Sequence, residues 1–141
     1  MKPTFTLFAA ALFFTLAPTP CFAIWDVLIV SKQEAKELGF DVRATAGKKY
    51  TQVTLEFSAD GKLKDFTQIN MKLGKGDDLI VSAPLREDRS KPGRILVGVT
   101  LGHTQLDKLA LTVMVPYRDG GLGGVAYELR VKDLVDVKNT P

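Results

Sequence analysis

Cysteine, histidine and tryptophan are nearly absent from this chain of 141 residues, which holds one of each: Cys21, His103 and Trp25. Cys21 lies inside an expected leader segment, so the working domain is expected to have no thiol. The usual zinc sites need several histidine or cysteine ligands and are therefore excluded. A disulfide framework and a cysteine nucleophile are excluded as well. The stability of the domain must come from packing.

Charge of one sign does not accumulate anywhere in the sequence. Lysine and arginine number 19 against 16 aspartates and glutamates, and the two signs are interspersed. Nucleic-acid binders concentrate positive charge on one face or along one helix, so nucleic acid is not an expected partner. Phosphate-binding loops are missing too, because Gly74-Lys75-Gly76 lacks the later glycine and the helix of a dinucleotide loop. We expect no cofactor.

Groups that could perform acid, base or nucleophilic chemistry are scarce. His103 could serve a Ser-His-Asp relay only if Ser82 or Ser90 and an acid converged on it in the fold. Glu56 and Glu128 are expected on outward strand faces, where they could form a carboxylate pair for glycoside hydrolysis. Nothing in the sequence distinguishes these two from ordinary surface charge. The sequence therefore predicts no enzymatic activity.

Carboxylates cluster only in expected turns. Calcium binds clustered oxygen ligands, and the candidates are Asp60, Asp77, Asp78, Glu87, Asp88 and Asp119. None follows the spacing of an EF-hand loop. Aspartate in a turn commonly accepts hydrogen bonds from the nearby backbone, so we interpret these residues as turn formers and expect no metal site.

The one long apolar run stands at the start of the chain. Residues 1–23 contain one early charge, the unbroken run FTLFAAALFFTLA at 5–17, and small residues three and one positions before residue 24. This is the pattern of a cleaved secretory signal peptide. A membrane span needs about 20 apolar residues, more than this run has. We expect a secreted or periplasmic protein that does not span a membrane after cleavage.

Apolar residues in the rest of the chain alternate with polar ones, almost always at odd positions. The alternation predicts eight strands near residues 27–30, 40–44, 53–57, 69–73, 79–85, 95–101, 109–115 and 125–131. A period of two places one face of each strand on a core and the other toward water. The breaks between strands are short and contain glycine or proline, which predicts tight turns and antiparallel neighbours.

One segment departs from the alternation. Residues 31–39 (SKQEAKELG) begin with a capping box formed by Ser31 and Glu34. Ala35 and Leu38 give the segment a small apolar face, and the final glycine can end a helix. We predict one or two helical turns that link the first two strands.

Eight short strands with a one-sided core favour an all-β fold, an antiparallel two-sheet sandwich of immunoglobulin-like type. The cysteine pair and core tryptophan of antibody domains are absent, so the expectation concerns architecture only. Residues 24–137 suit a single core and therefore a single domain. Residues 138–141 are expected to be a short tail.

The outward strand faces hold the first candidate for a binding site. Two strands, taken as neighbours and extended by one residue of the strand at 79–85, would form a weakly apolar patch: Ile80, Leu96, Thr100, Ala110 and Met114. Exposed apolar patches mark interaction sites. Alternatively, the helical segment at 31–38 folds over this patch and buries it.

The second candidate is the glycine-rich loop at 119–124 (DGGLGG), which leads from one strand into another. It predicts a hairpin tip that exposes Asp119 and Leu122, and loop tips commonly carry binding residues. A plain β-turn without a binding role is the simpler interpretation.

Together these features predict an exported module that binds another exported or envelope protein, or has a structural role, without chemistry of its own. The alternative is a carbohydrate- or cell-wall-binding module. Such a module needs a platform of coplanar aromatic rings, for which the outward candidates are Tyr50, Phe66 and Tyr117. A hydrolytic enzyme is the least favoured hypothesis. The sequence does not predict the oligomeric state.

Overall fold

Strands make up most of the chain in the computed structural model, which describes residues 23–136 and the backbone of 138–139. The strands are β1 (Ile24–Ile29), β2 (Asp41–Ala46), β3 (Tyr50–Ser58), β4 (Gln68–Leu73), β5 (Val81–Leu85), β6 (Arg94–Gly102), β7 (Leu109–Pro116), β8 (Gly123–Arg130) and β9 (Lys138–Asn139). The helical segments are α1 (Lys32–Leu38), η1 (Gly76–Asp78), η2 (His103–Lys108) and α2 (Val131–Leu134). All eight predicted strands are present.

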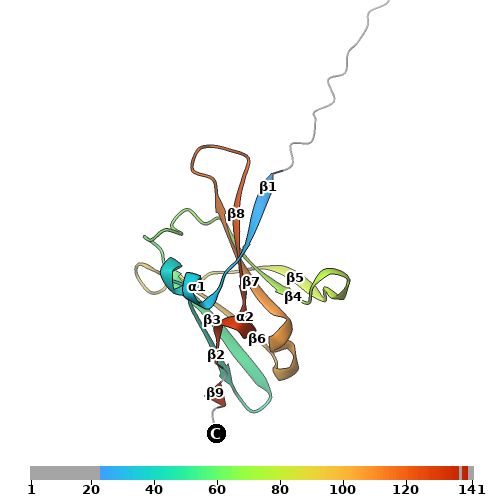
Figure 1. The fold of residues 1–141 in the computed structure, drawn as a ribbon. Coiled ribbons are helices and arrows are strands. Elements are labelled where there is room, and N and C mark those ends of the chain that lie inside the picture. Colours follow the sequence, from blue (N-terminus) through green and yellow to red (C-terminus); the bar gives the residue numbers. More distant parts are fainter. Residues whose placement is uncertain (1–22, 137, 140–141) are drawn as a thin grey trace, which may run out of the picture.

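The strands form two sheets (Figure 1). Sheet A has the order β1-β8-β7-β4-β5, and sheet B has the order β6-β3-β2-β9. Most neighbours are antiparallel, as predicted, but β1 pairs with β8 in parallel and β2 pairs with β9 in parallel. The all-antiparallel expectation was wrong for these two pairs, because alternation reports which face of a strand is buried and not which distant strand lies beside it.

The core lies between the inner faces of the two sheets and consists mainly of odd-numbered residues, as the alternation predicts. Sheet B contributes Val53, Leu55, Phe57, Ile95, Val97 and Leu101, and sheet A contributes Ile69, Leu73, Leu109, Leu111, Val113 and Leu129. Phe57 is fully buried and meets the rings of Phe40 and Phe66 edge to face at centroid distances of 5.7 and 5.2 Å. The two sheets therefore share one core, the arrangement of a β-sandwich.

Helix α1 forms where the capping box predicts it. The Ser31 side chain accepts a hydrogen bond from the backbone of Glu34, and the Glu34 carboxylate accepts one from Ser31 N at 2.9 Å. The Ser31 hydroxyl also donates to the Glu34 carboxylate at 2.7 Å, and this bond, together with the one from Ser31 N, lowers the pKa of Glu34. Gly39 ends the helix with φ of 82°, a conformation that favours glycine. Ala35 is buried, so the helix is anchored to the core by its predicted apolar face.

Three helical segments were not predicted: η1, η2 and α2. Each is six residues or shorter, too short to show a helical repeat in the sequence. Leu106 of η2 and Leu134 of α2 are buried and belong to the core. In the predicted tail, residues 138–139 form β9 beside β2, whereas residues 140–141 lie outside the described residues.

Strand β1 is fixed to the rest of sheet A by close contacts at its start. Gly123 and Gly124 of β8 face Ile24 and Trp25, and a Cβ atom at Gly124 would lie 2.7 Å from the Trp25 ring. The Tyr117 hydroxyl donates a hydrogen bond to the Asp26 carboxylate. That bond, with some burial, raises the pKa of Tyr117. These contacts place β1 at the edge of the sheet.

Residues 1–22, which contain most of the predicted signal peptide, lie outside the described residues. Among the helices of the described chain, none is long and apolar enough to cross a membrane.

Candidate protein-binding surface

The patch predicted from even-numbered residues is divided between the two sheets. Leu96 and Thr100 lie on β6 of sheet B, whereas Ala110 and Met114 lie on β7 of sheet A. Because β6 and β7 belong to different sheets, their outward faces lie on opposite sides of the sandwich. The prediction was wrong on this point: η2 carries the chain from one sheet to the other, and alternation does not reveal such a crossing.

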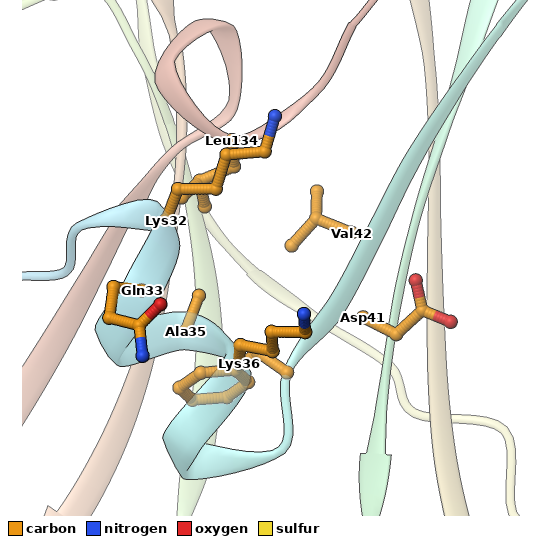
Figure 2. A pocket seen from close by; sticks show the side chains of 8 residues that line it. Lys32, Gln33, Ala35, Lys36, Asp41, Val42 and Leu134 are labelled. Atoms are coloured by element: carbon orange, nitrogen blue, oxygen red, sulfur yellow. The ribbon is translucent and has the colours of Figure 1, made fainter.

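Helix α1 does not cover the predicted patch. It lies beside β2 and α2, where a pocket of about 520 Å³ opens between these elements. Figure 2 shows Lys32 and Lys36 extending from α1 along this pocket, with Val42 on β2. Lys32 forms an exposed ion pair with Asp136 at 3.2 Å. The pocket brings together cationic and aliphatic side chains but no nucleophile with a base.

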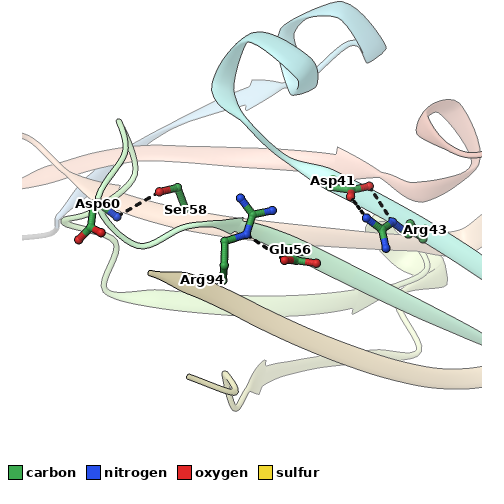
Figure 3. A network of polar contacts seen from close by, with 6 residues as sticks. All are labelled: Asp41, Arg43, Glu56, Ser58, Asp60 and Arg94. Atoms are coloured by element: carbon green, nitrogen blue, oxygen red, sulfur yellow. Dashed lines mark hydrogen bonds and ion pairs between the residues drawn. The ribbon is translucent and has the colours of Figure 1, made fainter. Parts of the chain in front are cut away.

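The outer face of sheet B is polar (Figure 3). Arg94 Nε donates to Glu56 Oε1 at 2.8 Å across β6 and β3, and Arg43 pairs with Asp41 along β2. The hydrogen bond from Arg94 lowers the pKa of Glu56. Leu96, from the predicted patch, is half-buried in this setting. Its N–H and C=O groups bond to Asp88 at 3.0 and 2.7 Å. This face therefore offers no apolar docking area.

The exposed apolar residues gather instead on sheet A, and most of all on β1. The exposed fractions are 69% for Ile24, 59% for Val27, 43% for Leu28 and 50% for Ile29. These side chains alternate between the two faces of the strand, so β1 exposes aliphatic side chains on both faces. It is also an edge strand with a neighbour on one side only. The segment before β5 adds Leu79 and Ile80, exposed at 46% and 57%.

A groove of about 750 Å³ runs along the outer face of sheet A next to β1. Its aliphatic lining includes Val27, Ile29, Leu79 and Ala110, and four lysines border it: Lys72, Lys75, Lys108 and Lys132. Within residues 23–136 these four lysines make no ion pair, whereas Arg130 in the same groove pairs with Glu128 at 3.0 Å. Asp78 and Asp107 also line the groove, so the surface combines aliphatic side chains with charges of both signs, of which the positive ones are in excess.

Met114 and Thr112 lie further along the same face of β7. Asn70 Nδ2 contacts Met114 Sδ at 3.2 Å, which leaves Met114 half-buried. Thr112 is 5% exposed, and its hydroxyl has no hydrogen-bond partner among the described residues. Of the five residues of the predicted patch, Ala110 alone lines the groove, and Ile80 follows groove-lining Leu79 in the chain.

The predicted hairpin tip between β7 and β8 exposes Asp119 and Leu122, the latter at 63%. Asp119 Oδ1 accepts a hydrogen bond from Gly121 N at 3.0 Å, as expected of a turn aspartate. Asp88 does the same for Ser90 N at 2.8 Å. The described residues contain no group of three or more potential metal-ligating side chains.

The candidate catalytic residues do not come together. His103 Nδ1 lies 2.8 Å from the hydroxyl of Thr51, which is 1% exposed and closed to a substrate. Among the described residues, no hydrogen bond joins His103 to Ser82, which lies on β5, or to Ser90. Glu56 and Glu128 are paired with different arginines on different sheets.

The three aromatic residues proposed for sugar binding do not share a surface. Tyr50 is exposed on β3, whereas Phe66 packs on Phe57 and lies under the guanidinium of Arg89 at 5.5 Å. Tyr117 is bound to Asp26 near the other end of the molecule. Stacking on a sugar needs rings presented together.

The exposed edge strand β1 is the candidate binding feature that sequence reasoning missed. A strand was predicted over 27–30, but its position at a sheet edge was not. The signal was present in the run IWDVLI at 24–29, which has one charge and no lysine or proline. No protein-family model matches the chain, and comparison with curated proteins and with solved structures finds no significant match.

Proposed function

We propose that this protein is an exported, non-catalytic protein-binding module whose binding surface is strand β1 with the adjoining groove on sheet A. Export rests on the leader pattern of residues 1–23 and places the protein in the periplasm or outside the cell. An immunoglobulin-like sandwich is the architecture we propose for the two sheets. Its partner would be another exported or envelope protein or a second copy of the chain.

The observation that carries this proposal is the contrast between β1 and the other sheet edges. An edge strand presents unpaired backbone groups, and proteins protect such edges with proline, charge, short strands or a covering segment. Edge strand β5 contains Pro84, β6 is bridged by Asp88, and β9 has two residues. Strand β1 has six residues, exposes aliphatic side chains and contains no proline. Its one charge, Asp26, is hydrogen-bonded to Tyr117, and none of the described strands pairs with its outer edge.

The groove adds a second element to the surface. Aliphatic side chains at its base favour an apolar partner segment, because burying them releases about 25 cal/mol per Å² of apolar area. The four lysines at its rim favour a partner with acidic residues beside that segment and would increase the rate of encounter. An apolar strand is therefore the expected ligand.

The proposal is tested by affinity capture from envelope and secreted fractions, with the protein produced from its own full-length chain. We expect wild-type protein to retain a saturable partner and Val27→Lys to lose it at least tenfold, because a lysine would oppose an added strand. Thr100→Lys is the matched control, since Thr100 is exposed on sheet B. Equal capture by wild-type protein and Val27→Lys would remove β1 as the binding surface.

A further inference from the structure

Strand β1 turns the hydrogen-bonding groups of every second residue away from its sheet. Val30 N donates to the Glu128 carbonyl at 3.0 Å, so residues at even positions of the strand face β8. Trp25, Val27 and Ile29 therefore present their N–H and C=O groups at the outer edge. None of the described strands pairs there. Such a row of backbone groups is a template for the addition of another strand.

The side chains of β1 restrict what that strand can be. Val27 and Ile29 are at least half exposed on one face, and Leu28 is 43% exposed on the other. The single charge, Asp26, is hydrogen-bonded to Tyr117 within the molecule. A complementary strand is therefore aliphatic or aromatic and has no carboxylate opposite Asp26. The sequence of β1 itself fulfils the first condition, and it fulfils the second in every register that does not place Asp26 opposite its own counterpart.

We infer that the added strand is β1 of a second copy, antiparallel to the first about a two-fold axis at Val27. This inference rests on the proposed function, since it names the partner of the same surface. In this register Val27 faces its own counterpart, and Trp25 faces Ile29 of the partner subunit. All three outward residues of each strand are then hydrogen-bonded, because directly opposite residues exchange both bonds.

Other two-fold registers are less favourable. An axis at Asp26 would place two carboxylates directly opposite each other, which destabilises a strand pair. An axis at Leu28 would move Trp25 beyond the end of the partner strand and lose its pairing with isoleucine. Pairs of an aromatic and a β-branched residue are among the stabilising cross-strand pairs. The axis at Val27 keeps both such pairs and places Asp26 opposite an aliphatic residue.

The symmetry of this contact also limits its extent. A two-fold interface uses the same surface on both copies, so it closes at a dimer and does not propagate into a fibre. Two six-residue strands bury less than the roughly 1,200 Å² at which stable interfaces begin. We therefore expect a reversible dimer with a dissociation constant of about 10 μM to 1 mM.

Cysteine trapping tests the register. Opposite residues of a hydrogen-bonded antiparallel pair have Cα atoms about 5.5 Å apart, within the roughly 4.4–6.8 Å range of a disulfide. Val27→Cys is made in full-length protein carrying Cys21→Ala, which removes the single native cysteine. We expect mild oxidation to give a covalent dimer. Thr100→Cys, exposed on the other sheet, is the control and should stay monomeric.

A second cysteine position distinguishes the registers. Leu28 would lie diagonal to its own counterpart at about 7–8 Å, beyond the usual reach of a disulfide. We expect Leu28→Cys to be trapped at least fivefold more slowly than Val27→Cys. Sedimentation velocity on unmodified protein should show a concentration-dependent dimer that Val27→Lys abolishes. Circular dichroism shows whether each variant is folded, and Val27→Cys remains informative if the lysine variant is not.

The outcomes separate this inference from the proposed function. Wild-type protein that stays monomeric to about 1 mM, with no trapping at Val27→Cys, overturns the dimer. Faster trapping at Leu28→Cys, or equal trapping at Thr100→Cys, overturns the register. If the dimer fails while Val27→Lys still loses a captured partner, the protein-binding function stands with a different protein. If capture is also unchanged, both proposals fail.

Discussion

At the scale of single residues, two buried threonines differ in their hydrogen bonding, and this difference should change the free energy of unfolding. The Thr51 hydroxyl lies 2.8 Å from His103 Nδ1, whereas the Thr112 hydroxyl has no partner among the described residues. A buried polar group without a hydrogen bond costs about 1–3 kcal/mol, and replacing it with an apolar group of the same shape removes that cost.

We therefore expect Thr112→Val to raise the free energy of unfolding by about 1 kcal/mol. The matched variant Thr51→Val should lower it by about 0.5–1.5 kcal/mol, because it removes a hydrogen bond. Urea denaturation followed by circular dichroism measures both. Destabilisation by Thr112→Val equal to that by Thr51→Val would contradict the assignment of an unpaired hydroxyl.

The ion pair between Glu56 and Arg94 should make the stability of the folded protein depend on pH. The hydrogen bond from Arg94 lowers the pKa of Glu56 below 4.5 in the folded protein. A carboxylate whose pKa is lowered by folding stabilises the protein above its unfolded pKa and loses that effect as pH falls through the folded pKa. The stabilising effect of this pair should therefore be complete near pH 7 and disappear in acid.

We expect Glu56→Gln to lower the melting temperature near pH 7 and to differ progressively less from wild type as pH falls below about 4.5. Differential scanning calorimetry across this range makes the measurement. Glu37→Gln, on exposed α1, is the control and should change little at any pH. A difference for Glu56→Gln that stays constant with pH would contradict the role of the ion pair.

At the scale of elements, β1 depends on close contact with β8 at Gly124. A Cβ atom there would lie 2.1 Å from the Val115 carbonyl oxygen and 2.7 Å from the Trp25 ring. A methyl group therefore requires β8 to shift relative to the backbone of β7 and the Trp25 ring of β1 to move. Trp25 is the only tryptophan of the chain, so its fluorescence reports this movement directly.

We expect Gly124→Ala to shift Trp25 emission to longer wavelength and to destabilise the protein by about 1–3 kcal/mol through overpacking. Gly98→Ala on β6 is the matched control, since a Cβ atom there meets nothing within 4 Å. Its emission should equal that of wild type. Unchanged emission in Gly124→Ala would mean that β1 does not rest on this glycine.

At the scale of the whole molecule, local signals were predictable and long-range pairing was not. Odd-numbered core residues such as Val53 and Leu111 follow from alternation, and α1 follows from its capping box. The division of β6 and β7 between sheets depends on contacts between distant segments, which no local pattern encodes. For the same reason, the sequence predicted strand β1 but not its position at the edge of a sheet. The candidate surface could therefore be recognised only in the folded structure.

The pairing of β1 with β8 has a consequence for the order of folding. Ile24 pairs with Gly123, which is synthesised 99 positions later. The most apolar edge segment is thus among the first parts of the domain to be made, yet its partner strand is the last of sheet A. Contacts between such distant segments slow folding because a long loop must close first. A nascent chain that stops before residue 123 leaves β1 without its partner strand.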